Sequence, residues 1–369
     1  MRIFHKECVS LADEGYEVNL IAPVNKSFVE KGVKVLPAGR PKNRISRLFI
    51  TIPRLVFKAL RSNAKIFHFH DPELLLIAPI LRLSGAKVIY DVHEDYLTSI
   101  PTKAYIPRLI RGPLAKVAGF LELFAAKFCH KIIAEKYYRE RFTDATEILN
   151  YPLSSEPDST PAEVDCSIFD SKFDWLLYSG NITSDRGALT HIRFLEVCDN
   201  IAIAYIGRCR SSLAELIYSE LAKKGIDLGR VKIIGIDEYV APEIIANYTH
   251  KCRWLAGIAL FPYSEHYEKK ELTKFFEYMS AGLPVISTDF DAWRNVIEEN
   301  KCGFCISPDD PEGIANAVSL LRTQRTIALS MGMNGRESVA RKYNWPSEAR
   351  KLIQLYRSLL NMDSRTTRP

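Results

Sequence analysis

The chain has 369 residues, more than one ordinary hydrophobic core supports, and its 47% hydrophobic and 25% charged residues are typical of a folded soluble protein, so we expect two domains. The net charge of +6 is unevenly placed: residues 1–150 hold 24 Lys and Arg against 15 Asp and Glu, about +9, and the remainder 26 against 29, about −3. No recognisable nucleic-acid-binding module accompanies the basic half, which argues against a nucleic-acid partner.

The sequence also argues against a membrane span and an exported protein. Its strongest apolar run, 74–81, is interrupted by Pro79 and followed by Arg82, so it is too short to cross a bilayer. The first residues, among them Arg2 and Lys6, offer no apolar core of a secretory signal. We therefore expect a cytoplasmic protein. Peripheral association with the inner face of the cell membrane is compatible with that location.

Short apolar runs rich in β-branched and aromatic residues alternate with helical stretches in the first domain. The helical stretches are 45–61 and 109–130. The runs read as buried parallel strands at 18–22, 66–70, 87–91 and 131–134. Alternating strands and helices predict a doubly wound α/β domain.

The start of this domain departs from the usual order. Residues 2–14 read as a helix that leads directly into the strand at 18–22, whereas a nucleotide-binding α/β unit opens with a strand and a loop. We expect either a sequence that begins late or an N-terminal sheet that lacks its usual first strand.

Much of the basic excess falls in two segments of this domain, 40–65 and 103–141, where Lys and Arg alternate with Leu, Ile and Phe. This pattern fits helices that lie on an anionic membrane, and it fits the solvated faces of ordinary helices equally well. Peripheral contact with an anionic membrane through the basic N-terminal domain is therefore one of two open interpretations.

A second alternation follows a connecting segment, 153–165, that is rich in Ser, Pro, Asp and Glu. Its strands are expected at 175–179, 201–206, 231–234, 258–261 and 284–287. The predicted fold is thus α/β with two Rossmann-like domains facing a cleft. We place the N-terminal domain at 1–152 and the C-terminal domain at 166–344.

The eight cysteines lie far apart, with Cys302 and Cys305 as the exception. Such scatter without an export signal predicts reduced, mostly buried thiols and no disulfide framework. The Cys-Gly-Phe-Cys run lacks the second ligand pair that a structural zinc site needs, so we expect no metal there.

The segment 271–287 carries the densest chemical signal. It reads as a helix that includes Lys274 and Glu277 and ends at an Ala-Gly pair before a strand, with Leu272 and Thr273 as further candidate donor-binding residues. The free N–H groups and positive dipole at such an N-terminus suit a diphosphate, and Lys274 adds a full charge. Glu277, one turn on, can accept hydrogen bonds from ribose hydroxyls. An amphipathic helix with a surface Lys–Glu pair is the alternative.

A glycine-containing turn, 178–187, follows the first strand of the second domain. Gly180 lets the backbone approach a ligand, and Arg186 can clamp phosphate oxygens. An ordinary turn is the alternative, but the carboxyl end of a strand in such a fold is a frequent ligand site.

In the first domain, the segment 91–96 (DVHEDY) follows a strand, so His93 is expected at a carboxyl edge facing the cleft. A structural histidine is the alternative. His68, His70 and Asp71 end the preceding strand and either support this region or bind a metal. The Asp-Phe-Asp run 289–291 follows the last strand of the second domain. An Asp pair that holds a metal and a nucleotide diphosphate stands near the middle of the sheet of a single nucleotide-binding domain, so we expect no metal at this run.

Taken together, the chain resembles the family 4 retaining glycosyltransferases of the two-domain B fold, especially bacterial members that build polysaccharides and lipopolysaccharides. The resemblance covers nearly the whole chain. It implies that the first domain lies on the acceptor side, that the second binds the nucleotide-sugar, and that a helix at 345–362 returns to the first domain. It is carried by Arg2-Ile3, Leu11 to Val18, Asp91-Val92-His93, Asn150-Tyr151-Pro152, Gly180, Arg186-Gly187 and, most specifically, Phe276 to Ile286.

The resemblance implies a role for each matching residue. Arg186 and Lys274 would bind the donor diphosphate, Glu277 the ribose, and His93 would approach the donor sugar as the catalytic residue. The family commonly has another Glu eight residues before the ribose-binding one, but here that position is Lys269. We expect a UDP- or GDP-sugar donor as substrate, a glycan or lipid-linked acceptor, no cofactor and no metal.

The implied reaction is sugar transfer with retention of configuration. Arg186, Lys274 and the helix dipole would stabilise the departing diphosphate, so no hydrolase-like carboxylate pair is required. A sugar-nucleotide epimerase of the same double-Rossmann build is one alternative, and an inactive scaffold that lacks the first strand is another. A dinucleotide-dependent dehydrogenase is disfavoured because no G-x-G-x-x-G follows a predicted strand.

Overall fold

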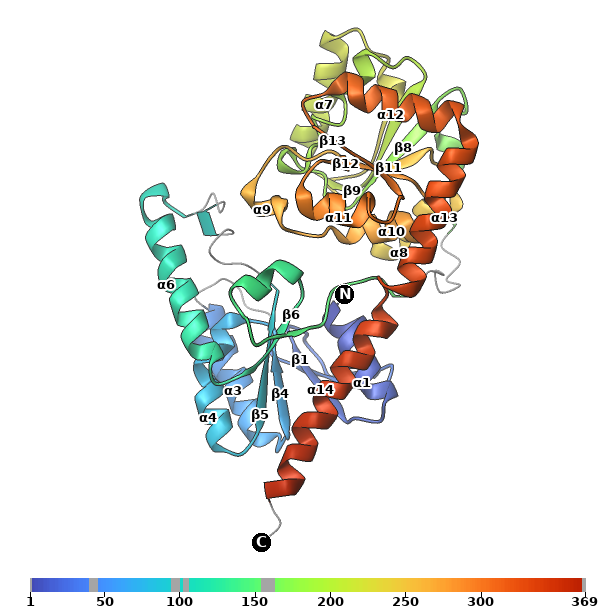
Figure 1. The fold of residues 1–369 in the computed structure, drawn as a ribbon. Coiled ribbons are helices and arrows are strands. Elements are labelled where there is room, and N and C mark those ends of the chain that lie inside the picture. Colours follow the sequence, from blue (N-terminus) through green and yellow to red (C-terminus); the bar gives the residue numbers. More distant parts are fainter. Residues whose placement is uncertain (1, 40–45, 94–99, 102–105, 154–162, 367–369) are drawn as a thin grey trace. The chain divides into compact units, whose positions relative to one another are not determined.

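The computed structural model describes residues 2–39, 46–93, 100–101, 106–153 and 163–366, and the chain divides into two compact units (Figure 1). Unit 1 comprises Met1–Asn150 and Trp345–Pro369, and unit 2 comprises Tyr151–Asn344. Most of the expected connecting segment, 154–162, lies outside the described residues. None of the described helices is both long and apolar enough to cross a lipid bilayer.

Unit 1 contains two separately hydrogen-bonded sheets among its described residues, ordered β1-β3-β2 and β4-β5-β6-β7. All pairings are parallel except β2 with β3. The strands are β1 (Val18–Ala22), β2 (Phe28–Glu30), β3 (Val33–Pro37), β4 (Ile66–Phe69), β5 (Lys87–Val92), β6 (His130–Ile133) and β7 (Thr146–Glu147). The four strands expected from the sequence are confirmed.

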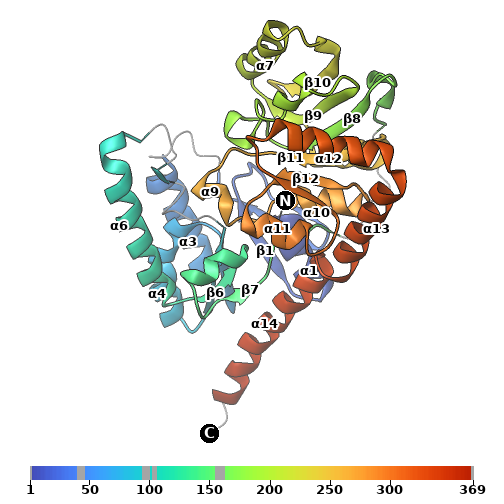
Figure 2. The same cartoon turned by 45° about the horizontal axis from the view of Figure 1, so that its top comes forward.

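The helices of unit 1 lie on both sides of the β4–β7 sheet, with α3, α4 and α6 on one side and α1 and α14 on the other (Figures 1 and 2). A π-helical segment leads into α1, so the helical start expected before β1 is confirmed. The bounds are π-helical Arg2–Cys8, α1 (Val9–Asp13), π-helical Arg47–Thr51, α3 (Ile52–Arg61), 3-10 Pro72–Ile77, α4 (Ala78–Leu83), α6 (Arg108–Ala126), 3-10 Lys136–Glu140 and α14 (Trp345–Thr366).

Alternation along β5 explains this layering. Val88, Tyr90 and Val92 point into the core under α4 and α6, whereas Ile89 packs on the opposite face against α14. Helix α14 presents Ala349, Leu352, Tyr356 and Leu359 to that face at helical spacing. Asp91 shares the side of Ile89, because residues two apart on a strand face the same way.

Unit 2 is one parallel sheet ordered β10-β9-β8-β11-β12-β13. Its strands are β8 (Asp174–Ser179), β9 (Ile201–Cys209), β10 (Val231–Ile236), β11 (Ala256–Ala259), β12 (Val285–Thr288) and β13 (Gly303–Ile306). Its α-helices are α7 (Ser211–Lys223), α8 (Pro242–Lys251), α9 (Glu265–Glu268), α10 (Thr273–Ser280), α11 (Asp291–Ile297), α12 (Pro311–Thr323) and α13 (Arg325–Arg341). Short 3-10 turns occupy Cys166–Ile168, Ser184–Arg186, Arg193–Glu196 and Leu228–Arg230. The chain order, three strands outward and then three the other way, is that of a Rossmann-like domain.

The expectation that all cysteines are reduced is wrong for one pair. Cys166 and Cys252 form a disulfide although they are 86 residues apart in the sequence. Cys166 begins a 3-10 turn just before β8, and Cys252 ends α8, so the packing of α8 beside β8 brings them together. Cys302 and Cys305 are free thiols on either side of the start of β13.

Candidate functional site

The strand order of unit 2 fixes where a ligand can bind. The sheet changes direction between β8 and β11, and open α/β sheets bind ligands outside the carboxyl ends of the strands at such a point. Gly180 follows β8, and α10 is the helix between β11 and β12. The turn after β8 and the start of α10 therefore belong to the edge of the sheet where a binding site is expected.

Lys274 is the most informative side chain at this edge. It is 9% exposed, and its ammonium group is buried with no hydrogen-bond partner in the described part of the chain. The nitrogen lies 3.5 Å from the centre of the Tyr178 ring and 5.3 Å from that of Phe261, so two aromatic rings flank the charge. Burial, and then the positive charge of Arg186, lower the pKa of Lys274 well below its ordinary value.

Arg186 lies at the end of the 3-10 turn Ser184–Arg186 and is held from one side. Its Nε donates a hydrogen bond to the hydroxyl oxygen of Tyr267 at 3.3 Å, and that hydroxyl donates to Asp185 at 2.7 Å. Because the charge of Arg186 lowers the pKa of Lys274, the two cations are near enough to repel each other. The structure thus brings together two of the residues expected to bind a diphosphate.

Glycines at two positions let the backbone fold tightly here. Gly180 has φ +93°, and a β-carbon added to it would meet no atom within 4 Å, so it borders open space. Gly187 has φ +81°, and a β-carbon there would lie 1.9 Å from the carbonyl oxygen of Leu260. The second glycine permits the close approach of this turn to the end of β11, and the first leaves room beside the end of β8.

The N-terminus of α10 has no side-chain cap, because its N-cap residue is Leu272. Thr273 is half-buried and stands at the first position of the helix, and Glu277 is half-buried one turn later. Uncapped N–H groups at a helix N-terminus favour an anion, to which the helix dipole adds. Lys274, the second residue of the helix, gives the same end its positive side chain.

A cavity of about 440 Å³ lies nearby in unit 2, but neither Arg186 nor Lys274 lines it. Its walls carry four carboxylates, from Glu265, Glu268, Asp289 and Asp291. Asp289 accepts a hydrogen bond from the Tyr263 hydroxyl at 2.6 Å and pairs with Arg294 at 3.3 Å. An acidic lining repels a diphosphate, so this cavity does not compete with the cationic site for one.

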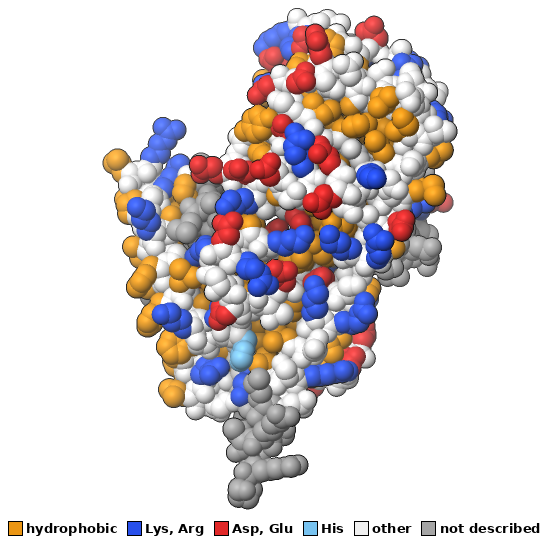
Figure 3. All heavy atoms as spheres, in the orientation of Figure 1, with side chains coloured by type: hydrophobic (Ala, Val, Ile, Leu, Met, Phe, Trp, Pro, Cys, Tyr) orange, Lys and Arg blue, Asp and Glu red, His pale blue; other side chains and the backbone are white. Residues whose placement is uncertain are grey.

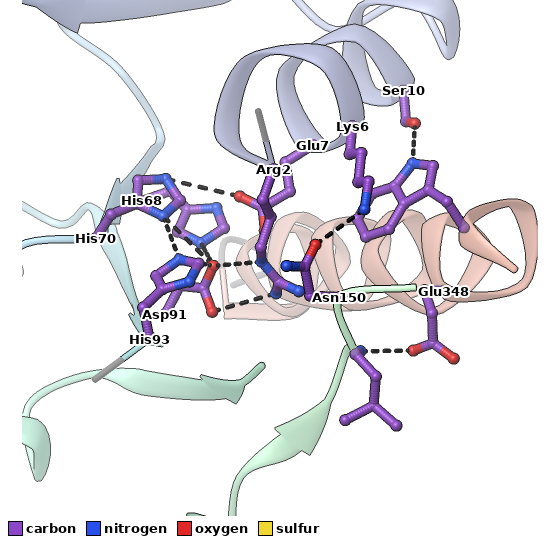
Figure 4. A network of polar contacts seen from close by, with 12 residues as sticks. Arg2, Lys6, Glu7, Ser10, His68, His70, Asp91, His93, Asn150 and Glu348 are labelled. Atoms are coloured by element: carbon purple, nitrogen blue, oxygen red, sulfur yellow. Dashed lines mark hydrogen bonds and ion pairs between the residues drawn. The ribbon is translucent and has the colours of Figure 1, made fainter. Parts of the chain in front are cut away.

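In unit 1, His93 directly follows β5 and contacts a buried carboxylate (Figure 4). Its Nε2 lies 2.7 Å from Oδ2 of Asp91, whose side chain is fully buried. The hydroxyl of Tyr138 donates to the backbone carbonyl of His93 at 2.9 Å. The ring and backbone of His93 are therefore both held in place. Glu94, Asp95 and Tyr96 of the same motif lie outside the described residues.

Asp91 is the centre of a buried network. Nε and Nη2 of Arg2 donate to its two oxygens, each at 3.3 Å, and Nδ1 of His70 lies 3.3 Å from Oδ2. Burial by itself would raise the pKa of Asp91, but the charge of Arg2 and the adjacent histidines hold it well below its usual range. Asp91 is thus an anion whose charge Arg2 neutralises.

Glu7 completes the network, with an oxygen 2.7 Å from Nε of Arg2 and another 3.6 Å from Nε2 of His70. Burial and the negative charge of Asp91 raise the pKa of Glu7 well above its ordinary value. Glu7, His68, His70 and Asp91 offer ligand atoms within 4.8 Å of one another, a spacing that suits a metal. Arg2 already pairs with both carboxylates, however, so the group is balanced by an internal cation and does not call for one.

Asp71 takes no part in this network. It pairs with Arg47 at 2.9 Å on the surface, while His68 donates or accepts a hydrogen bond with the hydroxyl of Tyr356 at 3.0 Å. Sequence reasoning also missed residues that shape both sites, above all Arg2, Glu7, Tyr178 and Tyr267. Only Arg2 carried a signal, as part of the family-like N-terminal motif.

Comparisons with known proteins found similarities to glycosyltransferases. Residues 201–324 match the model of the family described as "Glycosyl transferases group 1". A GDP-mannose-dependent alpha-(1-6)-phosphatidylinositol monomannoside mannosyltransferase of Mycobacterium tuberculosis is 32% identical over 83 residues, which is 22% of each chain. A D-inositol 3-phosphate glycosyltransferase of Corynebacterium urealyticum is 30% identical over 86 residues, 23% of this chain and 20% of that protein. The matches span less than a quarter of either relative.

Solved structures resemble the chain over nearly its whole length. A sucrose-phosphate synthase from Thermosynechococcus elongatus covers 96% of this chain and 92% of its own, with a TM-score of 0.71 at 17% identity. HepE of Anabaena, in complex with UDP and glucose, covers 95% and 94% with a TM-score of 0.69 at 12% identity. WaaG, a glycosyltransferase involved in lipopolysaccharide biosynthesis, covers 94% of each chain with a TM-score of 0.64 at 13% identity. The expected glycosyltransferase B fold, with two Rossmann-like domains, is confirmed.

Proposed function

We propose that this protein is a glycosyltransferase that moves a sugar from a nucleotide-sugar donor to a glycan or lipid-linked acceptor. One observation carries the proposal: the ammonium group of Lys274 is buried without a hydrogen-bond partner in the described chain, at the start of an uncapped helix. A buried charge without a partner is costly, and a polyanionic ligand at this place would remove the cost. The match of residues 201–324 to the family of group 1 glycosyl transferases supports a nucleotide-sugar as that ligand.

Each residue of the cationic site has a proposed role. Lys274 and Arg186 bind the diphosphate oxygens, together with the N–H groups of Leu272 and Thr273. Glu277 accepts hydrogen bonds from the ribose hydroxyls. Gly180 gives the ligand close access to the backbone at the end of β8.

A UDP- or GDP-sugar is the proposed donor. HepE holds UDP and glucose, and the mycobacterial relative is GDP-mannose-dependent, so similar proteins handle both nucleotides. The mycobacterial relative is named for a phosphatidylinositol monomannoside, and WaaG is involved in lipopolysaccharide biosynthesis, which agrees with a glycan or lipid-linked acceptor here.

The proposed reaction breaks the bond between the anomeric carbon and the diphosphate and forms one to an acceptor hydroxyl on the same face of the sugar. Arg186, Lys274 and the α10 dipole stabilise the charge that develops on the diphosphate, a contribution of about 3 kcal/mol for each well-placed donor. These positive groups do the work that a divalent cation would do, so we propose transfer without a metal. His93, fixed by Asp91, is the proposed catalytic residue at the donor sugar.

Calorimetric titration of the full chain with UDP-, GDP- and ADP-sugars tests this proposal, followed by product analysis with candidate acceptors. We expect one donor class to bind, and the sugar to appear on an acceptor. Failure of all three classes to bind would reject the donor assignment. Conversion of the donor without an acceptor would instead favour the epimerase, and binding without turnover the inactive scaffold.

Contact of unit 1 with an anionic membrane belongs to the same proposal, because a transferase that acts on a lipid-linked acceptor must meet the membrane that holds it. The sequence left this contact and ordinary solvated helices as equal alternatives. The exposure of individual side chains on α6 supports the membrane contact.

A further inference from the structure

Helix α6 is amphipathic, but it buries its small residues and exposes its large apolar ones. Its inner face, against the core of unit 1, is made of small residues, among them Ala115, Gly119 and Ala125. Its large apolar side chains point outward instead, in a stripe at heptad spacing with exposed fractions of 51%, 42%, 56%, 51%, 54% and 38% for Ile110, Leu114, Val117, Leu121, Phe124 and Phe128. A helix of a soluble protein normally buries this stripe, so an outer surface of this kind marks an interaction site.

The charges of α6 are sorted by sign. Arg108, Lys116 and Lys127 are exposed alongside the apolar stripe. The single acidic residue of the helix, Glu122, is only 4% exposed, and its carboxylate accepts hydrogen bonds from Tyr90 at 2.5 Å and Arg141 at 2.8 Å. The outer face of α6 is therefore apolar and positive, with no exposed carboxylate of its own.

The space-filling view agrees with this sorting. Along the edge of unit 1 that α6 occupies in Figure 1, Figure 3 shows apolar side chains with Lys and Arg side chains among them. The neighbouring helix α4 adds Ile80, 51% exposed, and Leu83, 89% exposed. The apolar surface thus extends beyond a single helix.

We propose that α6 docks unit 1 onto an anionic lipid bilayer, lying in the plane of the membrane with its apolar stripe in the boundary between headgroups and acyl chains. This deepens the proposed function and rests on it for its purpose, since it brings the enzyme to a lipid-linked acceptor. A 19-residue helix is about 28 Å long, which gives a long, shallow contact rather than a span. Positive charge beside exposed apolar groups is what an anionic lipid surface attracts, whereas the interface between two copies of this face would oppose like charges.

Vesicle sedimentation with the full chain tests the proposal. The protein is mixed with vesicles of phosphatidylcholine alone or of phosphatidylcholine with phosphatidylglycerol. We expect binding to the vesicles that contain phosphatidylglycerol, and weaker binding at high salt. Exchange of Lys116 and Lys127 for Gln should weaken it about fivefold for each charge removed.

Two double variants test whether vesicle binding depends on the stripe of α6 or on exposed apolar side chains anywhere on the protein. Val117→Gln with Leu121→Gln removes two neighbours of the stripe and should weaken vesicle binding about tenfold or more. Leu329→Gln with Met333→Gln makes the same change on α13 of unit 2, where the residues are 67% and 70% exposed at the same spacing. This control pair should bind vesicles as the unchanged protein does.

Three results would overturn the proposal: no binding to either vesicle, equal binding to both vesicles, or equal loss in the α13 control. The unchanged protein could instead be a dimer in analytical ultracentrifugation that Val117→Gln with Leu121→Gln dissociates. That result would assign the stripe to an interface with a second copy of the chain. Calorimetry with the nucleotide-sugars on the same variants keeps the two ideas apart. Vesicle binding without any donor binding would support the membrane-docking surface and reject the proposed glycosyltransferase function.

Discussion

Exchange of Lys274 for methionine removes a buried positive charge while it keeps an unbranched side chain of similar length. Donor affinity should fall by about one to two orders of magnitude, because a hydrogen bond to a charged group contributes about 1.5–3 kcal/mol and about 1.4 kcal/mol is a tenfold change. Folding stability should respond in the opposite direction. The buried, unpartnered ammonium costs about 1–3 kcal/mol, of which the contact with the Tyr178 ring returns about 0.5–2 kcal/mol.

The methionine variant should therefore unfold at the same or a higher urea concentration than the unchanged protein. Lys274→Ala should lose donor affinity as well, but it also removes the buried stem and should lower the free energy of unfolding by about 2–5 kcal/mol. Lys223→Met on α7 is the matched control, because Lys223 is exposed and pairs with Glu220 at 2.7 Å. It should change neither quantity by more than about 0.5 kcal/mol.

The pH dependence follows from the direction of the pKa shift. Burial lowers the pKa of Lys274, so between its folded and ordinary pKa values the unfolded chain binds more protons, and stability rises with pH in that window. A bound diphosphate raises the same pKa, so donor binding takes up protons there and weakens as the pH rises. Calorimetry in two buffers of different ionisation enthalpy measures that uptake. Tight donor binding by the methionine variant, or its instability relative to the unchanged protein, would refute this reasoning.

Three further outcomes are expected. Gly180→Ala and Gly225→Ala both place a β-carbon in open space at positive φ and should each lose about 1–2 kcal/mol of stability, but only the first should also weaken donor binding in a calorimetric titration. Asp91→Asn should lower kcat about a hundredfold with little change in the KM of the donor, because the His93 ring that Asp91 holds shifts. A comparable rise in the KM of the donor would argue against a positioning role. Reduction of the Cys166–Cys252 disulfide should lower the free energy of unfolding by about 2–4 kcal/mol, measured by urea unfolding with and without dithiothreitol.

The core strands could be predicted from the sequence because each is a short run of β-branched and aromatic residues that the sheet buries. The strands that sequence reasoning missed carry a weaker signal. All three residues of β2 are exposed, β3 alternates buried with exposed residues, and β7 has only two residues. Strand β13 consists of the Gly-Phe-Cys-Ile run that was weighed only as a metal motif. Local pattern thus predicts the continuous apolar runs, even at a sheet edge as in β10, and fails where a strand is short, exposed or alternating.

The candidate sites divide in a similar way. The residues that follow a strand or begin a helix, such as Gly180 and Lys274, could be picked out because parallel strands end at a common edge. Their surroundings could not. Tyr178 and Lys274 meet because β8 lies next to β11, and Arg2 reaches Asp91 across 89 residues of sequence, so both contacts depend on packing between distant segments.

The balance of buried charge explains why one of the two polar clusters is the better candidate for a ligand. In unit 1, Arg2 pairs with both Asp91 and Glu7, and burial raises the pKa of Glu7, which favours its neutral form. In unit 2, the ammonium of Lys274 faces the Tyr178 ring and has no hydrogen-bond partner among the described residues. It feels the like charge of Arg186, which the negative charge of Glu277 opposes. A buried cation of this kind is tolerated most easily if an anion neutralises it for part of the catalytic cycle. The desolvation cost of Lys274 therefore favours the start of α10 as the proposed place for a diphosphate.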